Sequence, residues 1–198
     1  MHLDPSQETL LGVTVGALLA SVGGLLSGRF EQHLRRRERE QSAAQLFGEI
    51  LAALELILRL ANQARGRGEP FGPITQRFLK AAHRETQIYD RNRETLFDVR
   101  DPALRARTHL LLLQLSLSLD ALFETTQALA EAAAKAGPHA ATDPAADPRG
   151  ASFDFLMQLH GMIAPLLGMY EKIARQKFDA HDAAVQQTLG PRATANET

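Results

Sequence analysis

The sequence has no cysteine and no tryptophan, and only four of its 22 basic residues are lysine. Without cysteine, disulfide bonds and thiolate catalysis are excluded, which agrees with a reducing compartment. The formal net charge is −1, and no basic face is interleaved with aromatic residues, so we expect no nucleic-acid partner. The preference for arginine, together with abundant alanine and leucine, is typical of proteins from GC-rich bacterial genomes.

Signatures of enzyme chemistry are also missing. The seven histidines never stand three or four residues apart, so no metal-ligand spacing such as HExxH is present. No strand is predicted, so no glycine-rich loop follows one to hold a nucleotide phosphate. His109 and His160 are interpreted as hydrogen-bonded structural residues. The sequence therefore predicts no enzyme, no metal, no cofactor and no small-molecule substrate.

The most prominent feature of the chain is an uncharged stretch at residues 10–27, LLGVTVGALLASVGGLLS. As a helix, these residues extend about 27 Å, against a hydrocarbon core of about 30 Å, so we predict a transmembrane helix over residues 10–28. A secretory signal peptide fits badly, because only acidic side chains, Asp4 and Glu8, carry charge before the stretch. A buried core helix of a soluble protein stays open as an alternative, because no Trp or Tyr marks either end.

Positive charge follows this stretch instead of preceding it. Arginine favours the cytoplasmic side, so we predict residues 1–9 outside and the rest of the chain in the cytoplasm, in a single-pass protein of the bacterial inner membrane. Residues 29–42 are predicted to form a basic helix at the membrane lipid, with ion pairs from Glu31 to Arg35 and from Arg36 to Glu40. The arginines that define this topology are Arg29, Arg35, Arg36, Arg37 and Arg39.

Small residues recur at every fourth position of the predicted span. Such a stripe lets helix backbones approach closely in a membrane, where apolar side chains alone give no driving force for association. We therefore predict a homo-oligomer, or docking on other membrane-protein subunits, through this stripe. Its members are Gly12, Gly16, Ala20, Gly24 and Gly28.

The remaining chain is predicted to be all-α, with residues 43–189 forming a cytoplasmic antiparallel bundle of about four long helices. The first helix continues to about residue 64, either straight or bent at the membrane surface. Proline and glycine signals then place the other helices, a flexible loop and a disordered tail. The second to fourth helices cover residues 74–97, 102–136 and 152–189, the loop covers 137–150, and the tail covers 190–198.

Three apolar patterns indicate how the bundle packs. The first helix has a stripe at Phe47, Ile50, Leu54, Ile57 and Ala61. The third helix is apolar on nearly all sides from residue 110 to 115, which predicts a central position. The fourth helix is predicted to kink at Pro165 and to bury Phe155, Leu159, Met162, Leu166, Met169 or Tyr170, and Ile173. A second span over residues 155–170 is disfavoured, because Gln158, His160 and Pro165 lie within it.

These patterns favour a structural or interaction subunit with one membrane span. The alternatives are a membrane-perturbing effector that oligomerises through the small-residue stripe, and a soluble bundle that buries its N-terminal helix. A pore is less favoured, because the span has no polar face beyond Thr14, Ser21 and Ser27.

Overall fold

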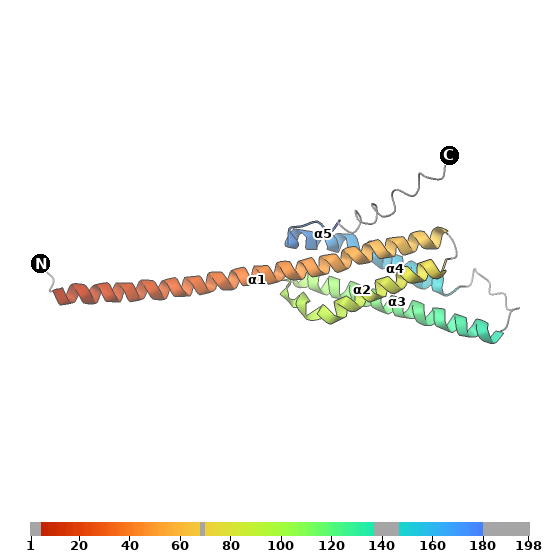
Figure 1. The fold of residues 1–198 in the computed structure, drawn as a ribbon, viewed down its shortest axis with the longest axis horizontal. Helices are drawn as coiled ribbons and strands as arrows, with labels where there is room; N and C mark the ends of the chain where they lie inside the picture. The colour runs from red at the N-terminus through yellow and green to blue at the C-terminus, as the bar shows by residue number, and fades with distance from the viewer. Residues whose placement is uncertain (1–4, 68–69, 137–146, 180–198) are drawn as a thin grey trace, which may run out of the picture. The chain divides into compact units, whose positions relative to one another are not determined.

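The computed structural model describes residues 5–67, 70–136 and 147–179, with side chains from residue 31 onward. These described parts are helical and contain no strand, so the all-α prediction is confirmed. The elements, shown in Figure 1, are α1 (Pro5–Arg67), α2 (Pro73–Asn92), the 3₁₀ helix η1 (Arg93–Asp98), α3 (Pro102–Ala136), α4 (Arg149–Gly161) and α5 (Ile163–Ala174).

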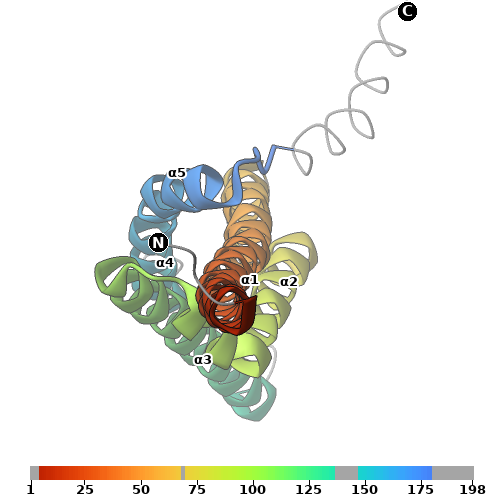
Figure 2. The ribbon, with the colours of Figure 1, turned by 90° about the vertical axis from the view of Figure 1, so that its left-hand side faces the viewer.

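The chain divides into two units, residues 1–39 and residues 40–198. In the first unit the backbone of α1 is helical from Pro5, and residues 31–39 are exposed. In the second unit the rest of α1 joins a helical bundle in which α3 packs against α2, α4 and α5. Figure 2 shows these elements end-on.

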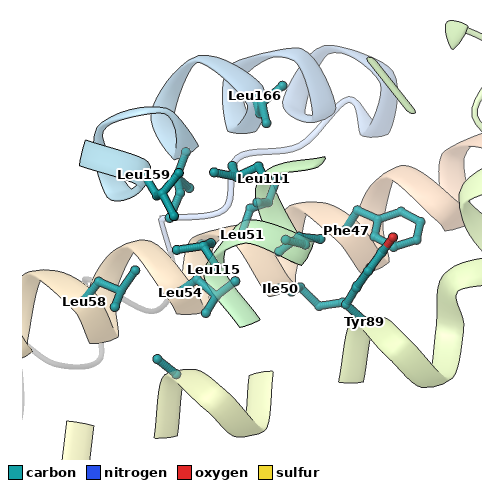
Figure 3. Close-up of a cluster of buried hydrophobic side chains, with 14 of the residues drawn as sticks. Phe47, Ile50, Leu51, Leu54, Leu58, Tyr89, Leu111, Leu115, Leu159 and Leu166 are labelled. Carbon is teal, nitrogen blue, oxygen red and sulfur yellow. The ribbon is translucent and has the colours of Figure 1, made fainter. Parts of the chain in front are cut away.

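The bundle core is built on one stripe of α1. Phe47, Leu51, Leu54 and Leu58 are fully buried, while Ile57 is half-buried. Figure 3 shows the four fully buried side chains gathered with Tyr89 of α2, leucines 111 and 115 of α3, Leu159 of α4 and Leu166 of α5. Full burial of one such side chain contributes about 1.5–3 kcal/mol, so this stripe holds the bundle together.

The second predicted helix changes form before it ends. Residues 74–97 were expected to be one α-helix, but α2 stops at Asn92 and η1 continues to Asp98. Leu96 of η1 is buried, and so is Val99, which follows η1 in an extended conformation. The backbone N–H of Val99 donates to the carbonyl of Leu96 at 3.2 Å and closes the last turn.

Helix α3 has the bounds that the sequence predicted, Pro102–Ala136. The carboxylate Oδ1 of Asp101 accepts hydrogen bonds from the backbone N–H groups of Ala103, at 2.8 Å, and Leu104, at 3.2 Å. This is an N-cap, and it fixes where the helix begins.

Helix α3 packs against α2, α4 and α5, as its predicted central position requires, but one side of the helix is uncovered. Leu110, Leu113 and Leu117 are 54%, 42% and 59% exposed. The opposite side carries the buried Leu111, Leu115 and other core residues. Leucine is so frequent here that the helix has more apolar side chains than its neighbours cover.

The predicted fourth helix is two helices. Pro165 has no N–H to bond the carbonyl of Gly161, and α4 ends at that glycine. After a turn at Met162, α5 runs only to Ala174, where Arg175 adopts a left-handed conformation with φ of 57°. Residues 180–189 of the predicted helix lie outside the described residues.

The predicted buried stripe of this region is partly wrong. Leu159, Leu166 and Tyr170 are buried as expected, but Phe155 and Met162 are exposed. Their places in the core are taken by the neighbouring Phe153, Leu156 and Ile163. Of the predicted loop 137–150, residues 137–146 lie outside the described part, and α4 begins within the remainder, at Arg149.

Candidate functional site

The residues of the predicted small-residue stripe, Gly12, Gly16, Ala20, Gly24 and Gly28, lie in the helical backbone of α1. Their side-chain positions, and that of Arg29, lie outside the described residues, so the predicted interface stays a prediction. Within the part of the chain that the structure describes, no helix is long and apolar enough to cross a membrane. This finding gives the predicted span no support.

The predicted topology arginines with described side chains are exposed along α1; they are Arg35, Arg36, Arg37 and Arg39. Arg35 donates to Glu31 at 2.6 Å, which confirms one predicted ion pair. The second predicted pair, from Arg36 to Glu40, is replaced: Glu40 binds Arg100, with 3.1 Å between Oε2 and Nε. Glu40 also accepts the backbone N–H of Arg100 at 3.1 Å. This carboxylate therefore ties α1 to the connection between η1 and α3.

Two buried tyrosines form the first polar cluster of the bundle. The hydroxyl groups of Tyr170 and Thr108 lie 2.9 Å apart, and the hydroxyl of Tyr89 is hydrogen-bonded to Nδ1 of His109. The ring of Phe47 contacts both tyrosine rings. Burial raises the pKa of Tyr170 to about 12 and raises that of Tyr89 as well, so both phenols are neutral at physiological pH. This cluster joins α1, α2, α3 and α5 and serves packing.

A histidine and a carboxylate form the second cluster, between α2 and α3. Nδ1 of His83 is buried without a hydrogen-bond partner among the described residues, and Oδ1 of Asp120 lies 3.6 Å from it. Gln87 contacts Nε2 of the same ring at 3.0 Å, and Phe123 packs edge-on against it. No described group of three or more metal-ligating side chains exists here or elsewhere.

Arginines and aromatic rings form the third cluster, where α4 begins. Arg65 donates to Asp154 at 2.7 Å, and its guanidinium lies 4.5 Å from the ring centre of Phe153. Arg149 lies 4.4 Å from the ring centre of Phe71 and binds the carboxylate of Asp147, which lowers the pKa of that carboxyl. Because both arginines already face carboxylates and rings, the cluster holds helix ends together.

The most distinctive surface is the uncovered side of α3 next to α4. We call it the α3–α4 face and define it as Leu110, Leu113, Leu117, Phe155 and Met162, all more than two fifths exposed. A shallow groove of about 260 Å³ includes Leu117 and Phe155 of this face and is otherwise lined by Gln114, Ser118, Ala121 and Ser152. None of these side chains carries a charge. Contiguous exposed apolar surface of this kind is typical of a docking site.

Sequence reasoning missed this face because it assigned Phe155 and Met162 to the core. Two signals in the sequence were relevant. Residues 110–119 carry no charge on any side of the helix, and residues 155–170 carry no formal charge. Helices with apolar residues all round must be covered on all sides or must leave some of these residues exposed.

Comparison with known proteins identifies no relative: no family model matches the chain, and neither a curated protein nor a solved structure matches it.

Proposed function

We propose that this chain is a non-enzymatic structural or interaction subunit. Residues 10–28 anchor it in the bacterial inner membrane, and its helical bundle docks through the α3–α4 face. The single observation that carries the docking role is the exposed, uncharged row formed by Leu110, Leu113 and Leu117 beside Phe155. Exposed apolar rows of this length are costly in water unless a partner covers them.

The anchor is supported by the sequence alone. Residues 10–27 carry no charge, and the arginines that follow favour the cytoplasmic side, so residues 1–9 lie outside and the bundle lies inside. The stripe of Gly12, Gly16, Ala20, Gly24 and Gly28 brings copies, or other membrane subunits, into contact within the lipid.

A non-enzymatic role is supported by the chemistry of the described side chains. Three polar side-chain pairs are satisfied inside the bundle: Thr108 with Tyr170, His109 with Tyr89, and His160 with the carbonyl of Glu55 at 3.1 Å. Nδ1 of His83 is buried without a hydrogen-bond partner among the described residues, and the carboxylate of Asp120 lies 3.6 Å from it. The groove of the α3–α4 face contains no titratable side chain. Acid–base or nucleophilic catalysis needs such a group within reach of a substrate.

Purification of the full chain from its own membranes in mild detergent tests the docking role. We expect a second chain, either another copy or a different protein, to be retained at fixed stoichiometry. The Leu117→Gln/Phe155→Gln variant should retain at least about tenfold less of this second chain, since apolar anchors dominate such interfaces. The matched control is Ile74→Gln/Phe97→Gln, which changes two exposed apolar residues away from this face. Equal retention in both variants would remove the docking role.

Alkaline extraction of membranes tests the anchor. The wild-type chain should stay in the membrane pellet, whereas Leu18→Arg/Val22→Arg should move to the supernatant, because each arginine costs about 2.5–3.5 kcal/mol near the centre of a span. Leu34→Arg, an exposed position outside the span, is the control and should stay in the pellet. Extraction of the wild-type chain into the supernatant would contradict the anchor.

A further inference from the structure

The α3–α4 face continues over both helices in a regular register. Leu117 and Phe155 line the same groove, as do Ala121 and Ser152, and Figure 1 shows that α3 and α4 run in opposite directions. Seven residues back along α3 from Leu117 is Leu110, and seven residues on from Phe155 is Met162. The antiparallel register therefore places the exposed Met162 near the exposed Leu110, and the face extends along about two turns of α3.

Charge is distributed along α3 with opposite signs at the two ends of this face. Arg107 is exposed one turn before Leu110, while Asp120 and Glu124 follow Leu117 and are also not buried. Between these ends, residues 108–119 carry no acidic or arginine side chain. The face is therefore basic at one end, apolar in the middle and acidic at the other end.

We propose that the occupant of the α3–α4 face is a second copy of this chain, related by a twofold axis that passes between Leu113 and Gln114. This proposal rests on the docking role proposed above and names its partner. In the twofold arrangement α3 lies antiparallel to its counterpart, and Leu110 of each copy is level with Leu117 of the other. An interface of this type must be self-complementary, and this face meets that condition.

Charge complementarity selects the antiparallel orientation. Arg107 of one copy is then level with Asp120 of the other and within about one turn of its Glu124. Both ends of the interface thus bring opposite charges together. A parallel arrangement would set Arg107 against Arg107 and Glu124 against Glu124, and like charges juxtaposed across an interface disfavour binding. The groove beside Phe155 gives room for an apolar side chain from the other copy.

Site-specific cross-linking of the full chain tests the proposal, because the natural sequence contains no cysteine. Gln114→Cys introduces a thiol beside the twofold axis, and Ile74→Cys is the control at an exposed site on α2. Both carry Gly16→Ile/Gly24→Ile, which removes association through the small-residue stripe. With a short bismaleimide, we expect the Gln114→Cys chain to form a covalent dimer at least about tenfold more than the control.

Charge reversal supplies the second measurement. Arg107→Glu in the Gln114→Cys chain should reduce the cross-linked dimer about fivefold, because it sets acidic groups together at both ends. Adding Glu124→Arg should restore part of the dimer, because it returns an opposite charge to each end while Asp120 stays acidic. Leu117→Glu should abolish it without unfolding the bundle, since Leu117 is 59% exposed.

Three results would overturn the second-copy interface. These are equal cross-linking of Gln114→Cys and Ile74→Cys, no cross-linking of either, and no recovery when Glu124→Arg is added to Arg107→Glu. If cross-linking fails but Leu117→Gln/Phe155→Gln still loses a retained chain of different mass, the docking role stands with another partner. If both measurements fail, the docking role falls as well.

Discussion

Phe178 shows how a single glycine shapes the bundle surface. Gly48 of α1 faces the ring of this phenylalanine so closely that a β-carbon at Gly48 would overlap the ring. Phe178 follows the left-handed turn at Arg175, and Glu171 accepts its backbone N–H at 3.4 Å. The C-terminal end of the described chain is thus held against α1 by an aromatic side chain that needs a glycine beneath it.

Gly48→Ala should displace Phe178 and lower the free energy of unfolding by about 1–3 kcal/mol, measured by urea denaturation. Gly66→Ala is the control, because nothing lies near its added methyl group, and it should raise the free energy of unfolding by about 0.4–1 kcal/mol. Phe178→Ala should cost little more in the Gly48→Ala chain. If the losses of unfolding free energy from Gly48→Ala and Phe178→Ala simply add in the double variant, the contact between Gly48 and Phe178 is absent.

The buried hydroxyl pair of Thr108 and Tyr170 makes a second residue-scale test. Tyr170→Phe leaves the Thr108 hydroxyl buried without its partner and should cost about 1–3 kcal/mol of unfolding free energy. Thr108→Val/Tyr170→Phe removes both hydroxyl groups and should cost less than the sum of the single changes. If the cost of the double variant equals the sum of the two single-variant costs in this double-mutant cycle, the hydrogen bond between the two hydroxyl groups is absent.

The same tyrosine predicts how stability depends on alkaline pH. Burial raises the folded-state pKa of Tyr170 from 10.0 to about 12, so the unfolded chain loses its phenolic proton first. The stabilisation is complete below pH 10 and declines between pH 10 and about 12. Urea midpoints measured across that range should fall less steeply with pH in the Tyr170→Phe variant. If they fall as steeply as in the wild-type chain, groups other than Tyr170 cause the loss of stability.

At the scale of helices, the start of α3 at Pro102 was predicted from the sequence, and the structure shows that the side chain of Asp101 caps it. Asp101→Ala should remove two hydrogen bonds and lower the free energy of unfolding by about 0.5–2 kcal/mol. Asp98→Ala, an exposed change on η1, is the control and should have an effect within about 0.5 kcal/mol. The urea midpoint of each variant measures the difference, and equal midpoints would contradict the cap.

Helix boundaries that depend on local chemistry were predictable, whereas choices made by packing were not. The start of α3 follows from its cap, and the break before α5 follows from Pro165. The burial of Phe153 in place of Phe155 depends on how α4 rotates against α1 and α3, which no local pattern in α4 determines. Glu40 likewise binds Arg100, sixty residues away, in preference to Arg36, four residues before it.

At the scale of the whole molecule, apolar residues at helical spacing and the lack of any predicted strand indicated an all-α chain, and the described residues confirm it. The candidate site was not predicted, because a sequence with leucines on every side of α3 does not say which side stays exposed. The predicted anchor and the docking face lie in different units of the chain, residues 1–39 and 40–198. Each can therefore be tested by substitutions that leave the other intact.

Thiol labelling in native membranes tests most directly whether the α3–α4 face is covered. Leu117 and Ile74 are 59% and 62% exposed in the isolated chain, so Leu117→Cys and Ile74→Cys should react equally with a water-soluble maleimide after purification in dissociating detergent. In native membranes we expect Leu117→Cys to react at least about tenfold more slowly, because a docked partner excludes the reagent. Equal labelling of the two positions in native membranes would contradict the proposed docking function.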